Sequence, residues 1–389
     1  MNLRAGNNPR VPGRRSLRRV VVPAAVAVAA GLMTVSAPLL PAAVAAPAKD
    51  GVQQSLNALV RDDGVPAATA SVTGRDGRTR NYVAGVADLR TGAKVPVDAQ
   101  VRIGSNTKAF TAVVVMQLVA EGKVDIEAPV DTYLPGLVRG DGIDGRNITV
   151  HQLLQHTSGL PEYGESLDLV GGRYTYTEPR DLLDLALARK ADFAPGTKWA
   201  YNNTNYLLAG MIVQKLTGRP VGEAITERII KPLGLRQTYF PAPGDMTIRG
   251  AHPQGYLKTQ PDAPLLDITE MDPSWAWAAG AMISTNSDLD RFYTALLGGR
   301  LLPAAQLAQM RTTVPADELA PGIRYGLGLT STPLSCGGVY WGHGGTIPGY
   351  RTRGGVTEDG RAANVTVTTI PTGAAAQHQA AAVDTALCR

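Results

Sequence analysis

The sequence has 389 residues, 44% of them hydrophobic, with 38 Lys and Arg against 33 Asp and Glu. Its 43 glycines show no period and it contains only two cysteines, so the composition excludes a collagen-like repeat, a disulfide-rich miniprotein and an intrinsically disordered chain. Six arginines and no acid lie in residues 1–45, and the other 344 residues carry 32 basic against 33 acidic groups. So neutral a chain creates no field that would steer phosphates, and we expect no nucleic-acid partner.

Residues 1–45 have the pattern of an export signal. A basic stretch is followed by small and apolar residues at 20–40 and by an Ala-Val-Ala cleavage site at 43–45. The alternative is a membrane anchor, because about 20 apolar residues can span a bilayer, but three prolines and the cleavage site favour removal. The Arg14-Arg15 pair permits twin-arginine export. We therefore predict a secreted protein with no membrane association after signal cleavage.

Helical and strand-like patterns alternate along the rest of the chain. Apolar residues have helical spacing at 52–61, through most of 107–250 and at 374–387, and strand-like alternation at 67–72, 80–86, 339–346, 350–356 and 364–370. Strands near both ends around a helical middle predict one sheet built from both termini, with an inserted helical lobe and a cleft between the two. We place the sheet domain at 46–106 and 271–389, and the helical lobe at 107–270.

One Ser-x-x-Lys motif is the first candidate for chemistry. The spacing of Ser105 and Lys108 places hydroxyl and ammonium on one helix face, so the amine can take or steer the serine proton. Chance alone supplies roughly 0.3 such pairs in a chain of this composition, so the motif needs support from other segments. Motifs of elbow-type hydrolases, zinc peptidases, P-loop enzymes and dinucleotide-binding proteins are absent from the sequence.

Two further segments supply that support. Tyr201 offers a phenol that could relay a proton, and Asn203 an amide that could orient an acyl group. His343 precedes Gly344 and Gly345 on a predicted strand, where missing side chains let a substrate backbone approach. Taken singly, Tyr201 could be a packed core residue and His343 an ordinary strand histidine. Taken in order with the Ser-x-x-Lys motif, these segments indicate a common site.

These motifs and several others along the chain resemble those of a known family. The landmarks are Ser105-Asn106-Thr107-Lys108, His156-Thr157-Ser158-Gly159-Leu160, Ala194-Pro195-Gly196, Tyr201-Asn202-Asn203-Thr204-Asn205, Ser274-Trp275-Ala276, Tyr325-Gly326-Leu327-Gly328 and the His-Gly-Gly strand. The chain thus resembles the penicillin-recognising serine hydrolases, which include class C β-lactamases, esterases, D-aminopeptidases and, most similar here, the secreted Streptomyces D-alanyl-D-alanine carboxypeptidases. The resemblance implies a β-lactamase/transpeptidase-like α/β fold, with an antiparallel sheet flanked by helices and an inserted all-α lobe.

The resemblance also implies acyl transfer through a covalent enzyme. Ser105 would attack the carbonyl, and Lys108 and Tyr201 would share the acid and base work, with the first proton acceptor left open. Backbone N–H groups of Ser105 and Thr346 would form the oxyanion hole, and Thr346 would also contact substrate. This chemistry requires no metal and no organic cofactor.

Other residues are implied to shape the site around this chemistry. Asn203 would hold a substrate amide, while Gly344 and Gly345 would border the substrate. His343 would lie near Tyr201, where cationic neighbours would favour a phenolate by lowering its pKa. Trp275 is a candidate wall of the acyl pocket, with a packing role as the alternative.

The two cysteines, Cys336 and Cys388, are expected to pair in an oxidising compartment. The alternatives are two buried free thiols or a metal site, and the latter is disfavoured because only His343 lies near ligand spacing. Streptomyces carboxypeptidases also have cysteines at these two places.

The chain departs from the carboxypeptidase pattern at two positions that grip a terminal carboxylate. An arginine and a threonine of the carboxypeptidase correspond here to Thr330 and Gly344. Arg351 or Arg353 could substitute, or could be solvated strand residues.

We predict an exported serine hydrolase that acts as a monomeric D-alanyl-D-alanine carboxypeptidase on peptidoglycan stem peptides. The alternatives are a class C-like β-lactamase, an esterase or a D-amino acid amidase that acts on β-lactams, esters or amides, and a non-catalytic cell-wall binding protein.

Overall fold

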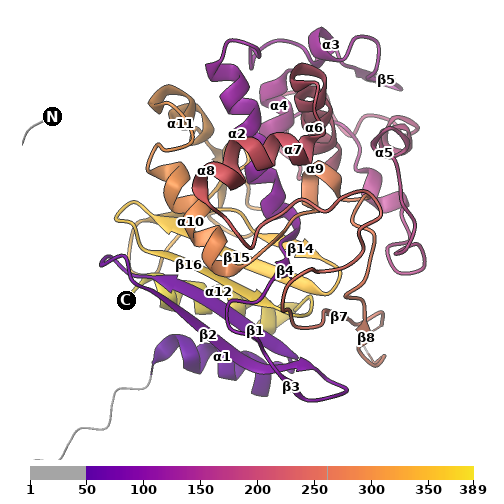
Figure 1. The fold of residues 1–389 in the computed structure, drawn as a ribbon. Helices are drawn as coiled ribbons and strands as arrows, with labels where there is room; N and C mark the ends of the chain where they lie inside the picture. Colours follow the sequence, from indigo (N-terminus) through magenta and orange to yellow (C-terminus); the bar gives the residue numbers. More distant parts are fainter. Residues whose placement is uncertain (1–49, 261) are drawn as a thin grey trace, which may run out of the picture. The chain divides into compact units, whose positions relative to one another are not determined.

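The sheet is assembled from strands at both ends of the described chain (Figure 1). The computed structural model describes residues 50–260 and 262–389, and the predicted export signal at 1–45 lies outside them. The strand order is β10-β11-β12-β13-β15-β16-β1-β2-β3, with β14 paired to β15, and every pairing is antiparallel. The predicted fold class, an antiparallel sheet flanked by helices with an inserted helical lobe, is confirmed.

The strands of this sheet are mostly short, and the four longest are neighbours in the strand order. The strands are β1 (Ala67–Thr73), β2 (Thr79–Asp88), β3 (Ala93–Lys94), β10 (Val314–Pro315), β11 (Arg324–Tyr325), β12 (Thr330–Pro333), β13 (Val339–Gly342), β14 (Gly345–Ile347), β15 (Tyr350–Thr357) and β16 (Ala362–Val367). Two-residue ladders elsewhere join β4 (Val101–Arg102) to β9 (Ile283–Ser284), β5 (Arg139–Gly140) to β6 (Ile143–Asp144), and β7 (Tyr256–Leu257) to β8 (Leu266–Asp267). The strand predicted at 339–346 is interrupted at His343 and Gly344, between β13 and β14.

Helices cover both faces of the sheet centre. Helices α1 (Gly51–Arg61) and α12 (Gly373–Leu387) pack on one face, and α10 (Asn286–Leu297) on the other (Figure 1). Because both faces are covered, β16 is buried along its whole length. Helix α1 packs through Val52, Leu56 and Leu59, which lie on one face at three- and four-residue spacing.

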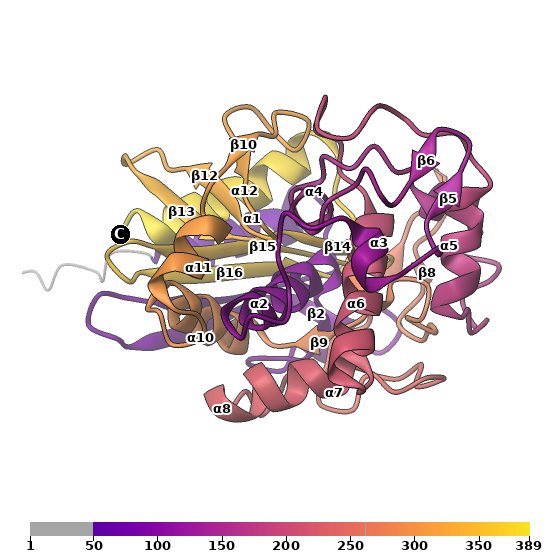
Figure 2. The same ribbon diagram turned by 90° about the horizontal axis from the view of Figure 1, so that it is seen from above.

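The helical lobe surrounds α2 (Thr107–Ala120), which is apolar on almost every side and buried over most of its length. Its partners include α6 (Asn203–Thr217), which lies beside it in Figure 2. The remaining helices are α3 (Val130–Tyr133), α4 (Val150–Gln155), α5 (Pro179–Leu187), α7 (Val221–Ile225), α8 (Lys231–Leu233), α9 (Trp277–Gly280) and α11 (Ala304–Met310), with 3₁₀ turns η1 (Gly104–Asn106) and η2 (Tyr163–Ser166) and a π turn η3 (Thr226–Ile230).

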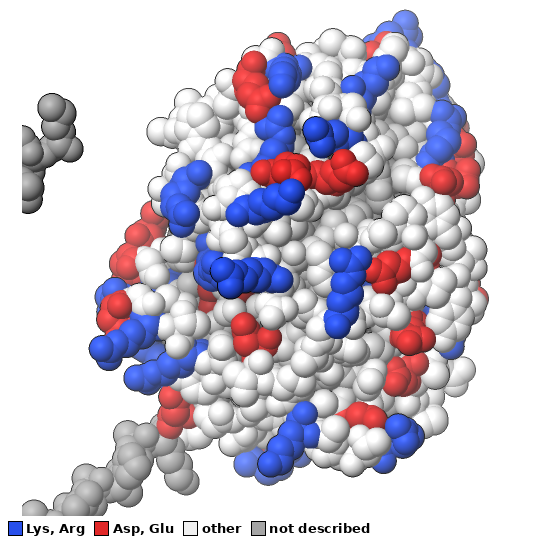
Figure 3. All heavy atoms as spheres, in the orientation of Figure 1, with Lys and Arg blue, Asp and Glu red and all other residues white. Residues whose placement is uncertain are grey.

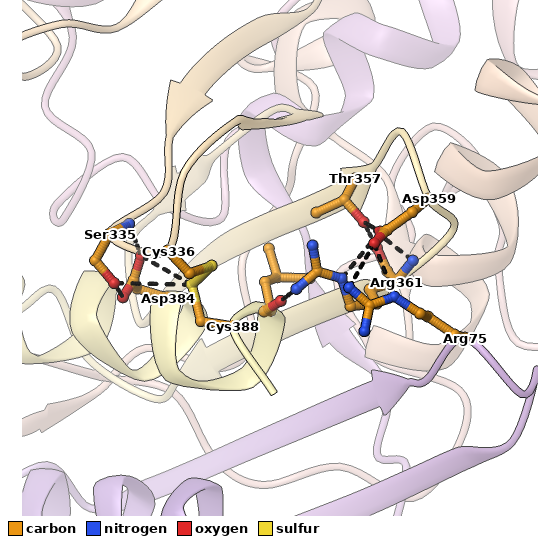
Figure 4. The surroundings of a disulfide bond; sticks show 9 residues. Arg75, Ser335, Cys336, Thr357, Asp359, Arg361, Asp384 and Cys388 are labelled. Atoms are coloured by element: carbon orange, nitrogen blue, oxygen red, sulfur yellow. Dashed lines mark hydrogen bonds and ion pairs between the residues drawn. A yellow bond between two sulfur atoms is a disulfide. The ribbon is translucent and has the colours of Figure 1, made fainter.

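A disulfide joins Cys336 to Cys388 and ties the end of α12 to the turn between β12 and β13 (Figure 4). Beside it, the backbone N–H of Ser335 donates to Asp384 at 2.8 Å, and the hydroxyl of Ser335 donates to the same carboxylate. The bond spans 52 positions, for which chain entropy predicts a stabilisation of about 4 kcal/mol.

The surface carries both signs of charge. Figure 3 shows basic and acidic side chains interspersed on the face seen in Figure 1. In the part of the chain that the structure describes, no helix combines the length and apolarity needed to cross a membrane.

Candidate active site

Ser105 lies in the tight turn η1 that leads directly into α2. The turn is held by buried Asn106, whose amide nitrogen donates to the Ile103 carbonyl at 3.0 Å and whose oxygen accepts from the Tyr293 hydroxyl at 2.8 Å. Gly104 has φ +50°, and a Cβ there would lie 2.9 Å from the backbone nitrogen of Thr346. Ser105 is therefore fixed at a helix start, where the strand that carries Thr346 meets the helical lobe.

Lys108 lies one turn further along and is completely buried. Its Nζ is 3.2 Å from the Oγ of Ser105, 2.6 Å from Oδ1 of Asn203 and 2.9 Å from the carbonyl oxygen of Ala279. Burial lowers the pKa of this amine to about 7, and the carboxylate of Glu162 opposes the shift. Near neutral pH, a substantial fraction of Lys108 is therefore a neutral amine that can accept the serine proton.

Asn203 is the first residue of α6 and connects Lys108 to Glu162. Its backbone N–H donates to Oε2 of Glu162, whose Oε1 accepts from the N–H of Gly164 at 2.7 Å. Because Oδ1 of Asn203 accepts from Lys108, its amide nitrogen is available to a substrate carbonyl. Sequence reasoning missed Glu162, since 41 positions separate it from Asn203 and no motif marks it.

Tyr201 places its ring centroid 4.9 Å from Nζ of Lys108 and 6.1 Å from the ring centroid of His343. Burial raises the pKa of the Tyr201 phenol well above its usual value, although the Ser105 hydroxyl and the Arg353 guanidinium oppose the rise. The expectation that cationic neighbours favour a phenolate is therefore corrected, because burial dominates and keeps the phenol protonated.

His343 is not one of those cations. Burial and the nearby Lys108 amine lower its pKa to about 3, so its imidazole is neutral at physiological pH. Its Nε2 lies 2.9 Å from the hydroxyl of Tyr325, which lies 3.1 Å from Nε2 of buried His156. His156, Tyr325 and His343, which come from three different sequence motifs, thus form one hydrogen-bonded chain beside Tyr201.

Strand β14 runs directly against η1. A Cβ on Gly345 would lie 1.8 Å from the carbonyl oxygen of Ile103, so only glycine permits this contact. The same approach brings the backbone of Thr346 to that of Gly104, next to Ser105. This arrangement suits the expected oxyanion hole, in which N–H groups from two segments face one oxygen.

A cavity of about 590 Å³ opens over Ser105. It is lined by residues of the motif segments and by neighbouring strand and helix residues, among them Ser105, Tyr201, Asn203, Thr330, Tyr340, His343, Gly344, Thr346, Arg351 and Arg353. The lining does not include Trp275, which is half-buried and packs against the core of the helical lobe, while its carbonyl accepts from the Tyr163 hydroxyl at 2.7 Å. The structure therefore does not bring Trp275 into the site. Lys108 is completely buried and does not itself line the cavity.

The described residues contain no evident metal centre. Within residues 50–260 and 262–389, no group of three or more His, Cys, Asp or Glu side chains is placed to hold a metal ion.

Comparisons with known proteins place this arrangement in a family. The Beta-lactamase family model matches residues 52–387. Penicillin-binding protein 4 of Amycolatopsis lactamdurans is 33% identical over 279 residues, which cover 67% of this chain and 69% of that protein.

Two solved structures are also similar. A D-stereospecific amidohydrolase from Streptomyces sp. is 41% identical with a TM-score of 0.78, over 85% of this chain and 97% of its own. The D-amino acid amidase from Ochrobactrum anthropi SV3, complexed with L-phenylalanine amide, is 27% identical with a TM-score of 0.77, over 86% and 96%. With the Ser-x-x-Lys pair assembled beneath a cavity and a family match across nearly all of the described residues, this chain belongs to the Beta-lactamase family of serine hydrolases.

Proposed function

We propose that this protein is an amidohydrolase that forms an acyl-enzyme at Ser105 and cleaves amide bonds at the carbonyl of D-amino acid residues. The observation that carries the chemistry is the buried Lys108 amine, 3.2 Å from the Ser105 hydroxyl, with its pKa near 7. The D-stereospecificity rests on similarity to the Streptomyces amidohydrolase and the Ochrobactrum amidase.

Lys108 and Tyr201 differ in their ionisation, and this assigns the role of base to Lys108 and the role of acid to Tyr201. The neutral Lys108 amine accepts the proton of Ser105 as Oγ attacks the carbonyl carbon. Backbone N–H groups of Ser105 and Thr346 stabilise the developing oxyanion, each by about 3 kcal/mol. Tyr201, held protonated by burial, donates to the leaving nitrogen and is reprotonated from Lys108. Asn203 orients the acyl amide.

Deacylation reverses this proton path. A water molecule enters after the amine has left, and the same groups remove its proton as it attacks the ester carbonyl. The proton then returns to Oγ of Ser105, so that the resting state is restored. No step requires a group outside this chain and the water.

Carboxypeptidase action on D-Ala-D-Ala peptides of the cell wall is the second candidate. It is supported by similarity to a penicillin-binding protein and by two arginines, Arg351 and Arg353, in the cavity lining. The secreted location predicted from residues 1–45 fits such a substrate and remains part of the proposal.

The test compares initial rates on D-phenylalanine amide, L-phenylalanine amide, N-acetyl-D-Ala-D-Ala, a chromogenic cephalosporin and a nitrophenyl ester. We expect the D-amide to exceed the L-amide by at least tenfold, with all turnover lost in Ser105→Ala. Ester turnover with no amide or peptide cleavage would retain the serine hydrolase and reject the amidohydrolase. Equal rates on the two amides would reject the D-preference.

A further inference from the structure

Two guanidinium groups lie on the cavity wall beside the site of acyl transfer. Arg351 and Arg353 belong to β15 and are separated by buried Thr352, so their side chains project from the same face of the strand. In the β14–β15 ladder, Arg351 is paired with Thr346, whose backbone borders Ser105. Both arginines are half-buried, which differs from the solvated strand residues considered from the sequence.

Neither guanidinium is neutralised by an acid of the described residues. Arg351 donates from Nη1 to the carbonyl of Pro371 at 3.1 Å, while its Nε is buried without a hydrogen-bond partner in the described structure. Arg353 donates from Nη1 to the carbonyl of Thr352 at 3.0 Å, with a longer contact of 3.4 Å to that of Gly345. The described lining of the cavity contains no Asp or Glu.

Burial without a counter-ion is costly for such groups. It lowers the pKa of both side chains, that of Arg351 to about 10, with the neighbouring Arg353 adding to the shift, yet both remain charged at neutral pH. A half-buried charge with unused donors is stabilised when an anion enters and accepts from them. The two guanidinium groups therefore favour the binding of an anion in this cavity.

The absence of a side chain at Gly344 leaves room for the guanidinium of Arg353. A Cβ at position 344 would lie 2.5 Å from Nη1 of Arg353, so a side chain there would compete with the guanidinium for space. Thr330, at the position where the carboxypeptidase pattern has its arginine, also lines the cavity. Thr330 and Gly344, the two departures from the carboxypeptidase pattern, therefore line the same cavity as the Arg353 guanidinium of β15.

We propose that Arg351 and Arg353 form a subsite that binds a carboxylate of the substrate, next to the bond that Ser105 attacks. The fork of N–H donors on a guanidinium matches the two oxygens of a carboxylate. This inference rests on acyl transfer at Ser105 and narrows the substrate class to amides and peptides that carry a carboxylate. The carboxylate belongs either to the leaving group, as a free C-terminus, or to the acyl group.

Two matched substrate pairs separate these sources. N-acetyl-D-Ala-D-Ala and its C-terminal amide differ only in a leaving-group carboxylate. N-succinyl-D-phenylalanine p-nitroanilide and its N-acetyl counterpart differ in an acyl-side carboxylate. We expect kcat/KM to be about 10- to 100-fold higher for the carboxylate member of one pair, and Arg353→Gln or Arg351→Gln to remove that preference.

Arg351→Gln should leave the uncharged members within about threefold of wild type, because Arg351 contacts none of the acylating groups. Arg353→Gln also removes a charge that lowers the pKa of Tyr201, so its effect on the subsite is read from the ratio of rates within each pair. Arg353→Lys should recover part of the preference, since it keeps the charge and loses the fork. Arg324→Gln is the matched control: Arg324 is exposed on β11, its side chain donates to Thr313, and it does not line the cavity.

The outcomes are distinguishable from failure of the proposed function. If both members of each pair are cleaved equally and the arginine variants change nothing, the subsite is rejected while the amidohydrolase stands. If no amide or peptide is cleaved but a nitrophenyl ester is, the proposed function fails; ester pairs with and without a carboxylate then test the subsite, and equal rates within them reject it.

Discussion

The hydroxyl of Tyr325 lies 2.9 Å from Nε2 of His343, and this contact is one of four consecutive hydrogen bonds that form a chain through the site. The N–H of Asn202 donates to Nδ1 of His156, so the proton of that ring is on Nε2, which donates to Tyr325. Tyr325 then donates to Nε2 of His343, whose Nδ1 donates to the carbonyl of Gly344. Every member is satisfied with both imidazoles neutral, in agreement with their lowered pKa values.

Removing the hydroxyl at the centre of this chain should cost stability. Tyr325→Phe leaves two buried imidazole nitrogens unpaired, and we expect the free energy of unfolding to fall by about 1–3 kcal/mol. Chemical denaturation measures this. Tyr174→Phe is the control because Tyr174 is exposed. A Tyr325→Phe protein as stable as wild type would show that the chain contributes nothing to the fold.

The rate of acylation should depend on the ionisation of Lys108. Burial lowers its pKa from the ordinary 10.5 to about 7, so the neutral, reactive amine predominates above that pH and is lost below it. We expect the rate of labelling by a fluorophosphonate to rise with pH about a midpoint near 7. Lys108→Met should react at least 100-fold more slowly at every pH. A wild-type rate independent of pH between 5 and 9 would contradict this role.

Glu162 should set where that midpoint lies. Its carboxylate raises the pKa of Lys108, so Glu162→Gln should move the midpoint to lower pH. Glu165→Gln is the matched control: Glu165 lies three residues away and is paired with Arg189 on the surface. A purely structural role for Glu162 would lower the rate at all pH values without moving the midpoint, and that result would reject the electrostatic role.

The close contact between β14 and η1 should tolerate no side chain at position 345. Gly345→Ala places a Cβ 1.8 Å from the Ile103 carbonyl, so the strand that carries Thr346 must shift. We expect kcat/KM to fall at least tenfold, since oxyanion donors act only when correctly placed. Gly51→Ala at the start of α1, where the nearest atom is the Thr385 methyl at 3.3 Å, is the control. Wild-type kcat/KM in Gly345→Ala would remove Thr346 from the proposed oxyanion hole.

The disulfide should affect stability and leave catalysis intact. Cys336→Ser combined with Cys388→Ser should lower the free energy of unfolding by about 2–5 kcal/mol, because the unfolded chain regains its freedom. Neither cysteine lines the cavity, so kcat/KM at 25 °C should remain within about twofold. Loss of activity at full folding would link the disulfide to the site.

Sequence patterns predicted what local spacing determines. Residues three apart at a helix start share a face, so the spacing of Ser105 and Lys108 predicted that their side chains meet. Assigning chemistry to the pair also needed the segments around Tyr201 and His343. The antiparallel sheet built from both termini also followed from the order of strand and helix patterns, together with the family resemblance. The domain boundaries assigned from those patterns remain a prediction.

Properties set by burial could not be predicted in this way. The neutrality of His343 and the protonated state of Tyr201 depend on how completely the fold removes them from water. Glu162 contacts Asn203 only because tertiary structure brings the two segments together. Trp275 packs against the core of the helical lobe, which its residue type does not predict. Residue type alone does not report the solvent exposure of a side chain.

The most direct test of acyl transfer at Ser105 is to locate the covalent intermediate. Intact-mass measurement and peptide mapping after quenching a reaction with a slowly deacylating D-aminoacyl ester should show one adduct per chain, on the peptide that contains Ser105. The adduct should be absent in Ser105→Ala and form at least 100-fold more slowly in Lys108→Met. An adduct on another residue, or one that forms at the wild-type rate without the Lys108 amine, would contradict the central claim.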